Sequence, residues 1–217
     1  MSPDLLNEFG KAFIETSWMM SIAVIFAIII GVPLGVMLFV TREGMFFENK
    51  FVQQVAGTIV NIIRSIPFII LLVVLIPVTK LILGTSMGPT AASVSLTVAA
   101  IPFYARLVEA SLREIDRGVI KAAESCGASP WLIIKDVLLP EAKPGMIAGL
   151  TVTIISLLSY SAMAGIVGGG GIGDLAIRFG YYRFQNDVMI ITVIILIILV
   201  QLIQFIGDKL AKAASKK

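Results

Sequence analysis

The residue types that perform most enzymatic chemistry are scarce in this sequence. It contains no histidine, which is the commonest acid–base catalyst and metal ligand, and its single cysteine, Cys126, cannot form an intrachain disulfide. No lysine follows a phosphate-binding glycine pattern of the Walker type, and no metal site is expected. We therefore predict that the chain is not an enzyme, and that any energy it uses comes from another protein.

One glycine-rich stretch matches the dinucleotide-binding pattern GxGxxG at Gly168, Gly170 and Gly173. A dinucleotide site needs this pattern between a strand and a helix of a βαβ unit, whereas here it follows a long apolar segment. We expect a flexible turn outside the membrane instead, because glycine lets the backbone bend sharply.

Long apolar segments dominate the chain, and these segments must position any polar side chains that have a functional role. Hydrophobic residues make up 58% of the sequence and charged residues only 14%, against about a quarter in soluble domains. A membrane-spanning helix needs roughly 20 mostly apolar residues. Five segments fit, at residues 18–40, 55–78, 91–108, 146–167 and 188–206. We predict an all-α membrane protein with five transmembrane helices in a single domain, residues 1–217.

The distribution of basic residues predicts the orientation, because cytoplasmic segments carry an excess of lysine and arginine. With the C-terminus inside, the inner segments hold twelve basic residues: Arg42, Lys50, Arg106, Arg113, Arg117, Lys121, Lys135, Lys143, Lys209, Lys212, Lys216 and Lys217. The outer segments hold four: Lys11, Lys80, Arg178 and Arg183. We expect the N-terminus outside and the C-terminus inside.

A few residues in the spans are candidates for lining or gating a pore. Arg64 lies within the second predicted span, where a charge is costly and usually faces the protein interior or water; it could also reach an interface. Tyr160, Ser161 and Met163 end the fourth span with mixed polarity and could line a pore, with Met163 as a soft apolar plug. Ordinary helix packing is the alternative for these three residues.

Small residues in the first span have two interpretations. Gly31 and Gly35 form a GxxxG pattern, which lets two helices approach closely. Pro33 between them could instead produce only a kink that neighbouring helices accommodate.

Turn and cap signals at residues 116–140 predict two short helices joined by a tight turn. Asp116 would cap the first helix, and Gly127 would end it in a left-handed conformation. Ser129 would cap the second helix with Pro130 in its first turn, and Pro140 would stop it.

The second short helix places Trp131, Ile134 and Leu138 on one apolar face. A DNA-reading helix-turn-helix is disfavoured, because basic and acidic residues balance within 113–143 and a phosphate backbone requires an excess of positive charge. The segment could be a simple connector. It could also dock in a groove of a soluble partner, since Ala122 and Ala123 permit close approach.

The same segment resembles the cytoplasmic EAA loop of ABC-importer permeases, which reads Glu-Ala-Ala, three residues, Gly, nine residues, Ile, any residue, Leu-Pro. The corresponding positions here are Lys121, Ala122, Ala123, Gly127, Val137, Leu139 and Pro140. Lys121 stands where the acid is usual, and Val137 replaces isoleucine. Glu124, one turn later, could take over the acidic role. The resemblance implies that these residues, with Ser129 and Pro130, form an ATPase-coupling loop.

Further segments extend the resemblance to methionine-import permeases over nearly the whole chain: residues 61–72 (NIIRSIPFIILL), 84–88 (GTSMG), 138–142 (LLPEA), 160–165 (YSAMAG) and 204–208 (QFIGD). It implies a type I importer permease in the bacterial inner membrane. Two copies would pair with a cytoplasmic ABC ATPase homodimer, which binds ATP and magnesium, while this chain holds no cofactor. An external binding (lipo)protein would deliver L- or D-methionine. A permease for another small solute, an ion-coupled transporter or channel, and a scaffold without transport remain alternatives.

Overall fold

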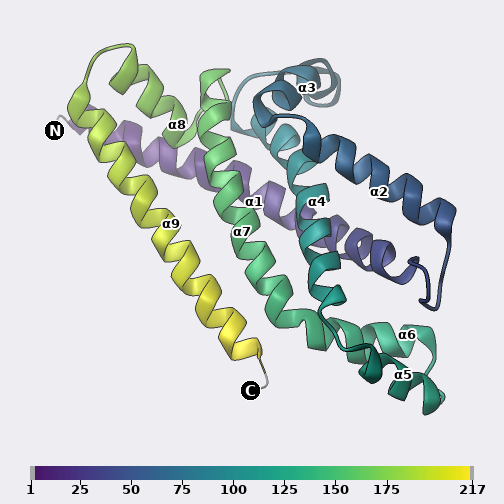
Figure 1. Ribbon diagram of the computed structural model, residues 1–217. Coiled ribbons are helices and arrows are strands. Elements are labelled where there is room, and N and C mark those ends of the chain that lie inside the picture. The colour runs from purple at the N-terminus through teal and green to yellow at the C-terminus, as the bar shows by residue number, and fades with distance from the viewer. Residues whose placement is uncertain (1–2, 216–217) are drawn as a thin grey trace.

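The computed structural model describes residues 3–215, and within that range it contains helices and no strand (Figure 1). The helices are α1 (Pro3–Val40), α2 (Lys50–Ser65), α3 (Phe68–Leu83), α4 (Pro89–Arg113), α5 (Arg117–Ser125), α6 (Pro130–Leu132), α7 (Leu139–Ile166), α8 (Gly171–Leu175) and α9 (Asn186–Ala214), with π-helical turns η1 (Ile133–Leu138) and η2 (Ala176–Tyr181). The predicted all-helical fold is confirmed.

Four stretches of this structure are long and apolar enough to cross a membrane: Leu5–Val40, Pro89–Arg113, Pro130–Ile166 and Asn186–Ala214. The first begins well before the predicted residue 18. A fifth crossing is obtained when α2 and α3 are counted together, as the sequence predicts.

The second predicted span is not one helix, because α2 and α3 meet at an angle of 106°. Pro67 lacks an N–H and restricts the residue before it, and Ile66 is accordingly extended (φ −80°, ψ 123°). Helix α2 therefore ends at Ser65, and α3 starts again in a new direction at Phe68.

Helices α1 and α4 form the most extensive contact in the fold, and the GxxxG pattern lies in it. A Cβ atom at Gly35 would lie 2.6 Å from the carbonyl oxygen of Ala105, and one at Gly31 would lie 3.2 Å from that of Ile101. The close-approach interpretation of this pattern is therefore confirmed, as a contact within one chain.

The two ends of the molecule carry different segments. The N-terminal end of α1 lies beside α8, and the C-terminal end of α9 lies at the opposite end, together with α5 and α6 (Figure 1). This arrangement separates the two groups of loops compared in the charge count. Lys216 and Lys217, which belong to that count, lie outside the described residues.

Candidate functional site

The predicted helix–turn–helix is present with the expected caps. The Asp116 carboxylate accepts a hydrogen bond from the Gly118 N–H at 2.7 Å. Gly127 has φ of 78°, which is the left-handed conformation. The Ser129 hydroxyl accepts from the Leu132 N–H at 3.4 Å, with Pro130 as the first residue of α6.

The expectation that Pro140 stops the second helix is wrong. Pro130–Ile166 is one continuous 37-residue helical stretch, with Pro140 in the first turn of α7. The preceding turn is π-helical, and the Leu139 N–H donates to the Ile134 carbonyl five residues back. This wider turn accommodates a proline that lacks an N–H and would clash within a regular α-helical turn.

The turn between α5 and α6 is open to the surroundings. Five of the predicted coupling residues are exposed: Lys121, Ala122, Glu124, Gly127 and Ser129. The other four are partly buried: Ala123, Pro130, Leu139 and Pro140. No described part of the chain covers the tip, so it is available to a partner.

The three residues of the predicted apolar face differ in burial. Ile134 and Leu138 are buried, but Trp131 is 74% exposed, with its ring centroid 6.3 Å from that of Phe47. Helix α5 packs against η1 rather than against α6, which leaves the first turn of the second helix uncovered. Trp131 and Leu132 therefore form an exposed apolar tip.

The structure brings two of the four pore candidates together. Arg64 and Tyr160 line a common pocket of about 120 Å³ at the bend between α2 and α3. The Tyr160 ring stacks on Phe68 with 4.6 Å between centroids. The Arg64 guanidinium lies 5.8 Å from the centre of the Phe103 ring. The pocket thus combines one cation with three aromatic rings.

The other two candidates do not line this pocket. The Ser161 hydroxyl is buried and donates to the Leu158 carbonyl at 2.7 Å, which is ordinary packing within α7. Met163 is 39% exposed on the same helix. Of the three candidates on α7, only Tyr160 lines this pocket, and the pore-lining role of all three stays a prediction.

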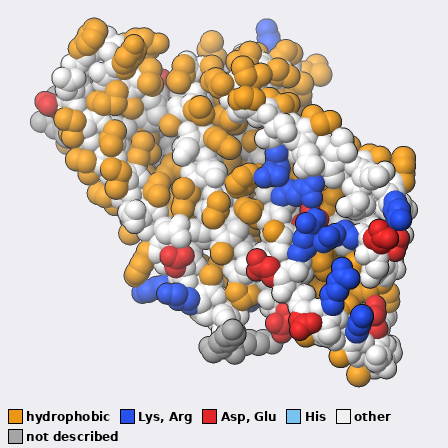
Figure 2. Space-filling model, in the orientation of Figure 1, with side chains coloured by type: hydrophobic (Ala, Val, Ile, Leu, Met, Phe, Trp, Pro, Cys, Tyr) orange, Lys and Arg blue, Asp and Glu red, His pale blue; other side chains and the backbone are white. Residues whose placement is uncertain are grey.

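Basic side chains form a stripe on one face of the molecule, between α2 and α4 and down toward α5 and α6 (Figure 2). Arg64 and Asn61 are exposed on α2, and Arg106 is partly exposed on α4. Charged groups inside a membrane avoid lipid and face protein or water. This face is consequently expected to meet water or another protein chain.

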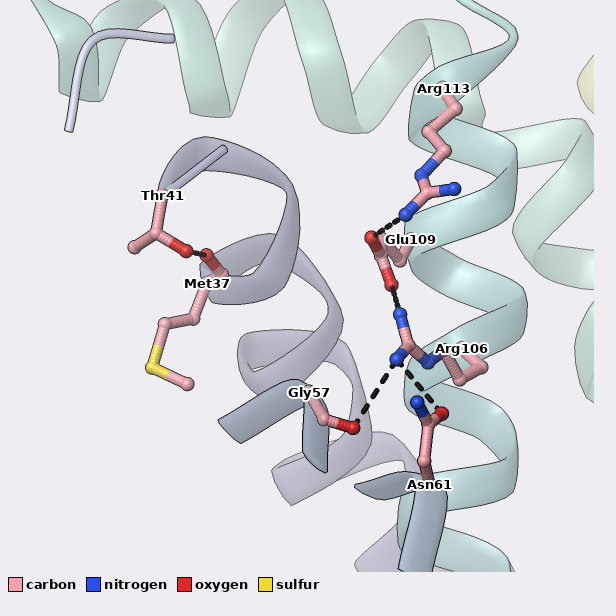
Figure 3. A network of polar contacts seen from close by, with 7 residues as sticks. All are labelled: Met37, Thr41, Gly57, Asn61, Arg106, Glu109 and Arg113. Carbon is pink, nitrogen blue, oxygen red and sulfur yellow. Dashed lines mark hydrogen bonds and ion pairs between the residues drawn. The ribbon is translucent and has the colours of Figure 1, made fainter. Parts of the chain in front are cut away.

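A buried carboxylate organises the centre of this stripe (Figure 3). Glu109 is only 1% exposed and pairs with two arginines, Arg106 at 2.5 Å and Arg113. Arg106 in turn donates to the Asn61 side chain at 2.9 Å and to the Gly57 carbonyl at 3.4 Å. The network ties the last turns of α4 to α2.

This network was not predicted from the sequence. The signal was present, because Arg106, Glu109 and Arg113 follow one another at spacings of three and four residues on one helical face. The contacts to Asn61 and Gly57 join residues more than forty positions apart, and no local pattern predicts them.

The glycine run is closely packed rather than flexible. The Gly171 N–H donates to the Glu15 carboxylate at 2.8 Å, and the Ile172 N–H donates to the Thr16 hydroxyl at 2.9 Å. A Cβ atom at Gly173 would lie 2.2 Å from the Cα of Ala162. Glycine is required here because α8 turns back onto α1 and α7 at backbone contact distance.

Comparisons with known proteins agree on one family. The family model of the inner membrane component of binding-protein-dependent transport systems matches residues 31–216. The D-methionine transport system permease protein MetI of Escherichia coli (strain K12) is 48% identical over 217 residues, all of both chains. The methionine import system permease protein MetP of Bacillus subtilis (strain 168) is 46% identical over 181 residues, 83% of this chain and 82% of the relative.

Solved structures give the same result. A chain in inward-facing crystal structures of the MetNI methionine ABC transporter superposes with a TM-score of 0.97 at 46% identity, over 100% of both chains. A chain of an amino acid ABC transporter crystallised with histidines has a TM-score of 0.73 at 20% identity over 97% of this chain and 94% of that one, which shows a shared fold.

Proposed function

Because the chain belongs to the family of binding-protein-dependent transport system inner membrane components, we propose that two copies of it form the path by which methionine crosses the inner membrane. The chain is a permease subunit, and ATP hydrolysis takes place in a separate ATPase. The assignment of methionine as the substrate rests on the 48% identity to a D-methionine permease over its full length.

The transport path lies along the basic stripe between α2 and α4. Arg64 is exposed within a membrane-crossing pair of helices, and such a charge is stable only against water or protein. Pairing two copies through this face would turn both stripes inward and leave the apolar surfaces of α1 and α9 to the lipid. Oligomers of identical chains are usually symmetric in this way.

The pocket beside Arg64 suits the chemistry of methionine. A guanidinium pairs well with a carboxylate, and the rings of Phe68, Phe103 and Tyr160 offer surfaces on which a thioether is stabilised. At about 120 Å³, the pocket in one chain is small for the whole amino acid. We assign it a brief contact with the passing substrate, with the second copy completing the enclosure.

The exposed turn between α5 and α6 receives motion from the ATPase. Its tip carries Trp131 and Leu132, which would enter a groove on that partner. ATP and magnesium would be bound there and not by this chain. Closing of the two ATPase subunits would move the α5–α6 turns of both permease copies. This movement would switch the transport path between an outward-facing and an inward-facing state.

The orientation follows from the same assignment. The end with α5, α6 and the C-terminus faces the cytoplasm, and the end with the N-terminus and α8 faces outward. The packed glycine run would then lie where an external methionine-binding protein approaches. Lysine and arginine numbers in the connecting segments support this direction.

Reconstitution with the ATPase and the binding protein in liposomes tests the proposal. We expect ATP-dependent uptake of labelled methionine, and we expect the uptake of other labelled amino acids in a panel to be lower. Uptake of another solute without methionine would assign the permease to that solute. Uptake that persists without ATP and collapses with the proton gradient would instead indicate an ion-coupled transporter.

A further inference from the structure

We propose that Arg42, Arg113 and Arg117 form a binding site for a phosphate group of the kind carried by anionic phospholipids. The three side chains line one small pocket of about 50 Å³. Arg42 follows the end of α1, Arg113 is the last residue of α4, and Arg117 is the first residue of α5. Three separate elements thus bring a guanidinium to one place.

The positive charge in this pocket is not balanced by the described residues. Within the described part of the chain, the only carboxylate paired with any of the three arginines is Glu109, which Arg113 shares with Arg106. Arg42 and Arg117 have no ion-pair partner among residues 3–215. Three guanidiniums around a small cavity repel one another unless an anion joins them.

The excess positive charge affects the Arg42 guanidinium, which is partly buried. Burial lowers the pKa of its guanidinium, the nearby Arg113 lowers this pKa further, and Arg117 does so to a smaller extent. Glu109 acts in the opposite direction and does not cancel them. A bound phosphate would supply the missing negative charge and accept several charge-assisted hydrogen bonds.

The position of the pocket favours a lipid as the source of the phosphate. It lies where α1 and α4 end, which is the level of the headgroups for helices that cross a bilayer. The remainder of its lining is apolar and suits the glycerol and upper acyl region: Phe39, Met45, Ile115 and Ile120.

A phosphate held here would join α1, α4 and α5. Helix α5 begins the exposed turn to which the proposed function assigns coupling, so the ligand would steady the base of that turn. The binding itself does not depend on methionine or on transport. Its failure would therefore leave the proposed function intact, and the reverse also holds.

The test measures lipid retention by native mass spectrometry of the full complex with its ATPase, using phosphatidylglycerol and zwitterionic phosphatidylcholine. Arg42→Gln and Arg117→Gln should each weaken phosphatidylglycerol binding by about tenfold, as expected for one lost charge-assisted hydrogen bond. Arg117 is exposed, so this variant should fold normally. Lys50→Gln is the matched control, because Lys50 begins α2 and lies outside the pocket.

A second arm adds inorganic phosphate to the lipid-free complex and follows thermal unfolding, with chloride at equal ionic strength as reference. If phosphate raises the unfolding temperature and Arg117→Gln abolishes this effect, the phosphate site is supported. If the same variant leaves lipid binding unaffected, the natural ligand is soluble phosphate. The proposal is overturned if Lys50→Gln weakens lipid binding as much as the pocket variants do. It is equally overturned if no variant changes either measurement.

Discussion

Glu109→Gln tests whether the buried carboxylate holds the charge stripe together. The substitution preserves shape but removes the charge between Arg106 and Arg113, and the new amide N–H₂ group faces guanidinium donors. Breaking a fully buried ion pair costs about 3–5 kcal/mol. The Arg106 and Arg113 side chains are 22% and 44% exposed, so water compensates part of this loss. We expect a destabilisation of about 2 kcal/mol, below the fully buried range.

The measurement is the apparent Tm of the detergent-purified permease, followed by the intrinsic fluorescence of Trp18 and Trp131. A chain of this length loses about 2–4 °C per kcal/mol, so Glu109→Gln should lower the Tm by about 4–8 °C. Glu114→Gln is the matched control, because Glu114 is exposed and forms no ion pair within the described chain.

Adding Arg113→Gln to Glu109→Gln should restore part of the loss, because it removes one uncompensated cation. If Glu109→Gln and Glu114→Gln unfold at the same temperature, the carboxylate does not support the fold and the reasoning is refuted.

Three other substitutions address separate elements. Gly35→Ala should destabilise the chain by about 1–3 kcal/mol, because the new methyl group would push the Ala105 carbonyl and separate α1 from α4; thermal unfolding measures it. Gly127→Leu should uncouple ATP hydrolysis from uptake, because a bulky side chain would obstruct the turn that docks on the ATPase. Arg64→Gln should lower methionine uptake about tenfold through loss of a charge-assisted contact, without changing ATPase assembly.

Each of these changes has a matched control. Gly10→Ala adds a methyl group to the same helix with no atom within 4 Å. Gly44→Leu introduces leucine at nearly the same left-handed φ (79° against 78°) away from the turn, so it reproduces the backbone strain without the obstruction. Lys80→Gln removes a positive charge from the neighbouring α3. If a control substitution has the same effect as the substitution with which it is paired, the role assigned to that residue is contradicted.

Local backbone chemistry made the turn at residues 116–130 predictable. Asp116, Gly127 and Ser129 act through hydrogen bonds or dihedral angles within a few residues, and all three have the expected roles. Proline was less predictable. At Pro67 the span is interrupted and the following helix runs in a new direction. At Pro140 the helix continues, because the preceding π turn accommodates the proline. The sequence alone does not distinguish these two outcomes.

Tertiary contacts account for the features that the sequence did not reveal. Arg64 and Tyr160 meet in one pocket although ninety-six positions separate them, and their types alone suggested only that each faces something polar. The glycine run looked flexible because its close partners, Glu15 and Thr16, belong to the first helix. The spacing places Trp131 and Ile134 on one face but does not show that only Ile134 is covered, because that depends on where α5 packs.

The unbroken stretch Pro130–Ile166 has a mechanical consequence. The stretch runs from Trp131 to Tyr160 without a loop, but it bends between α6 and the body of α7 (Figure 1). The part that carries Trp131 is therefore a short arm set at an angle to the membrane-crossing part of α7. Because backbone hydrogen bonds continue through η1 into α7, a push on this arm would act on α7 directly, as a force on a bent lever does.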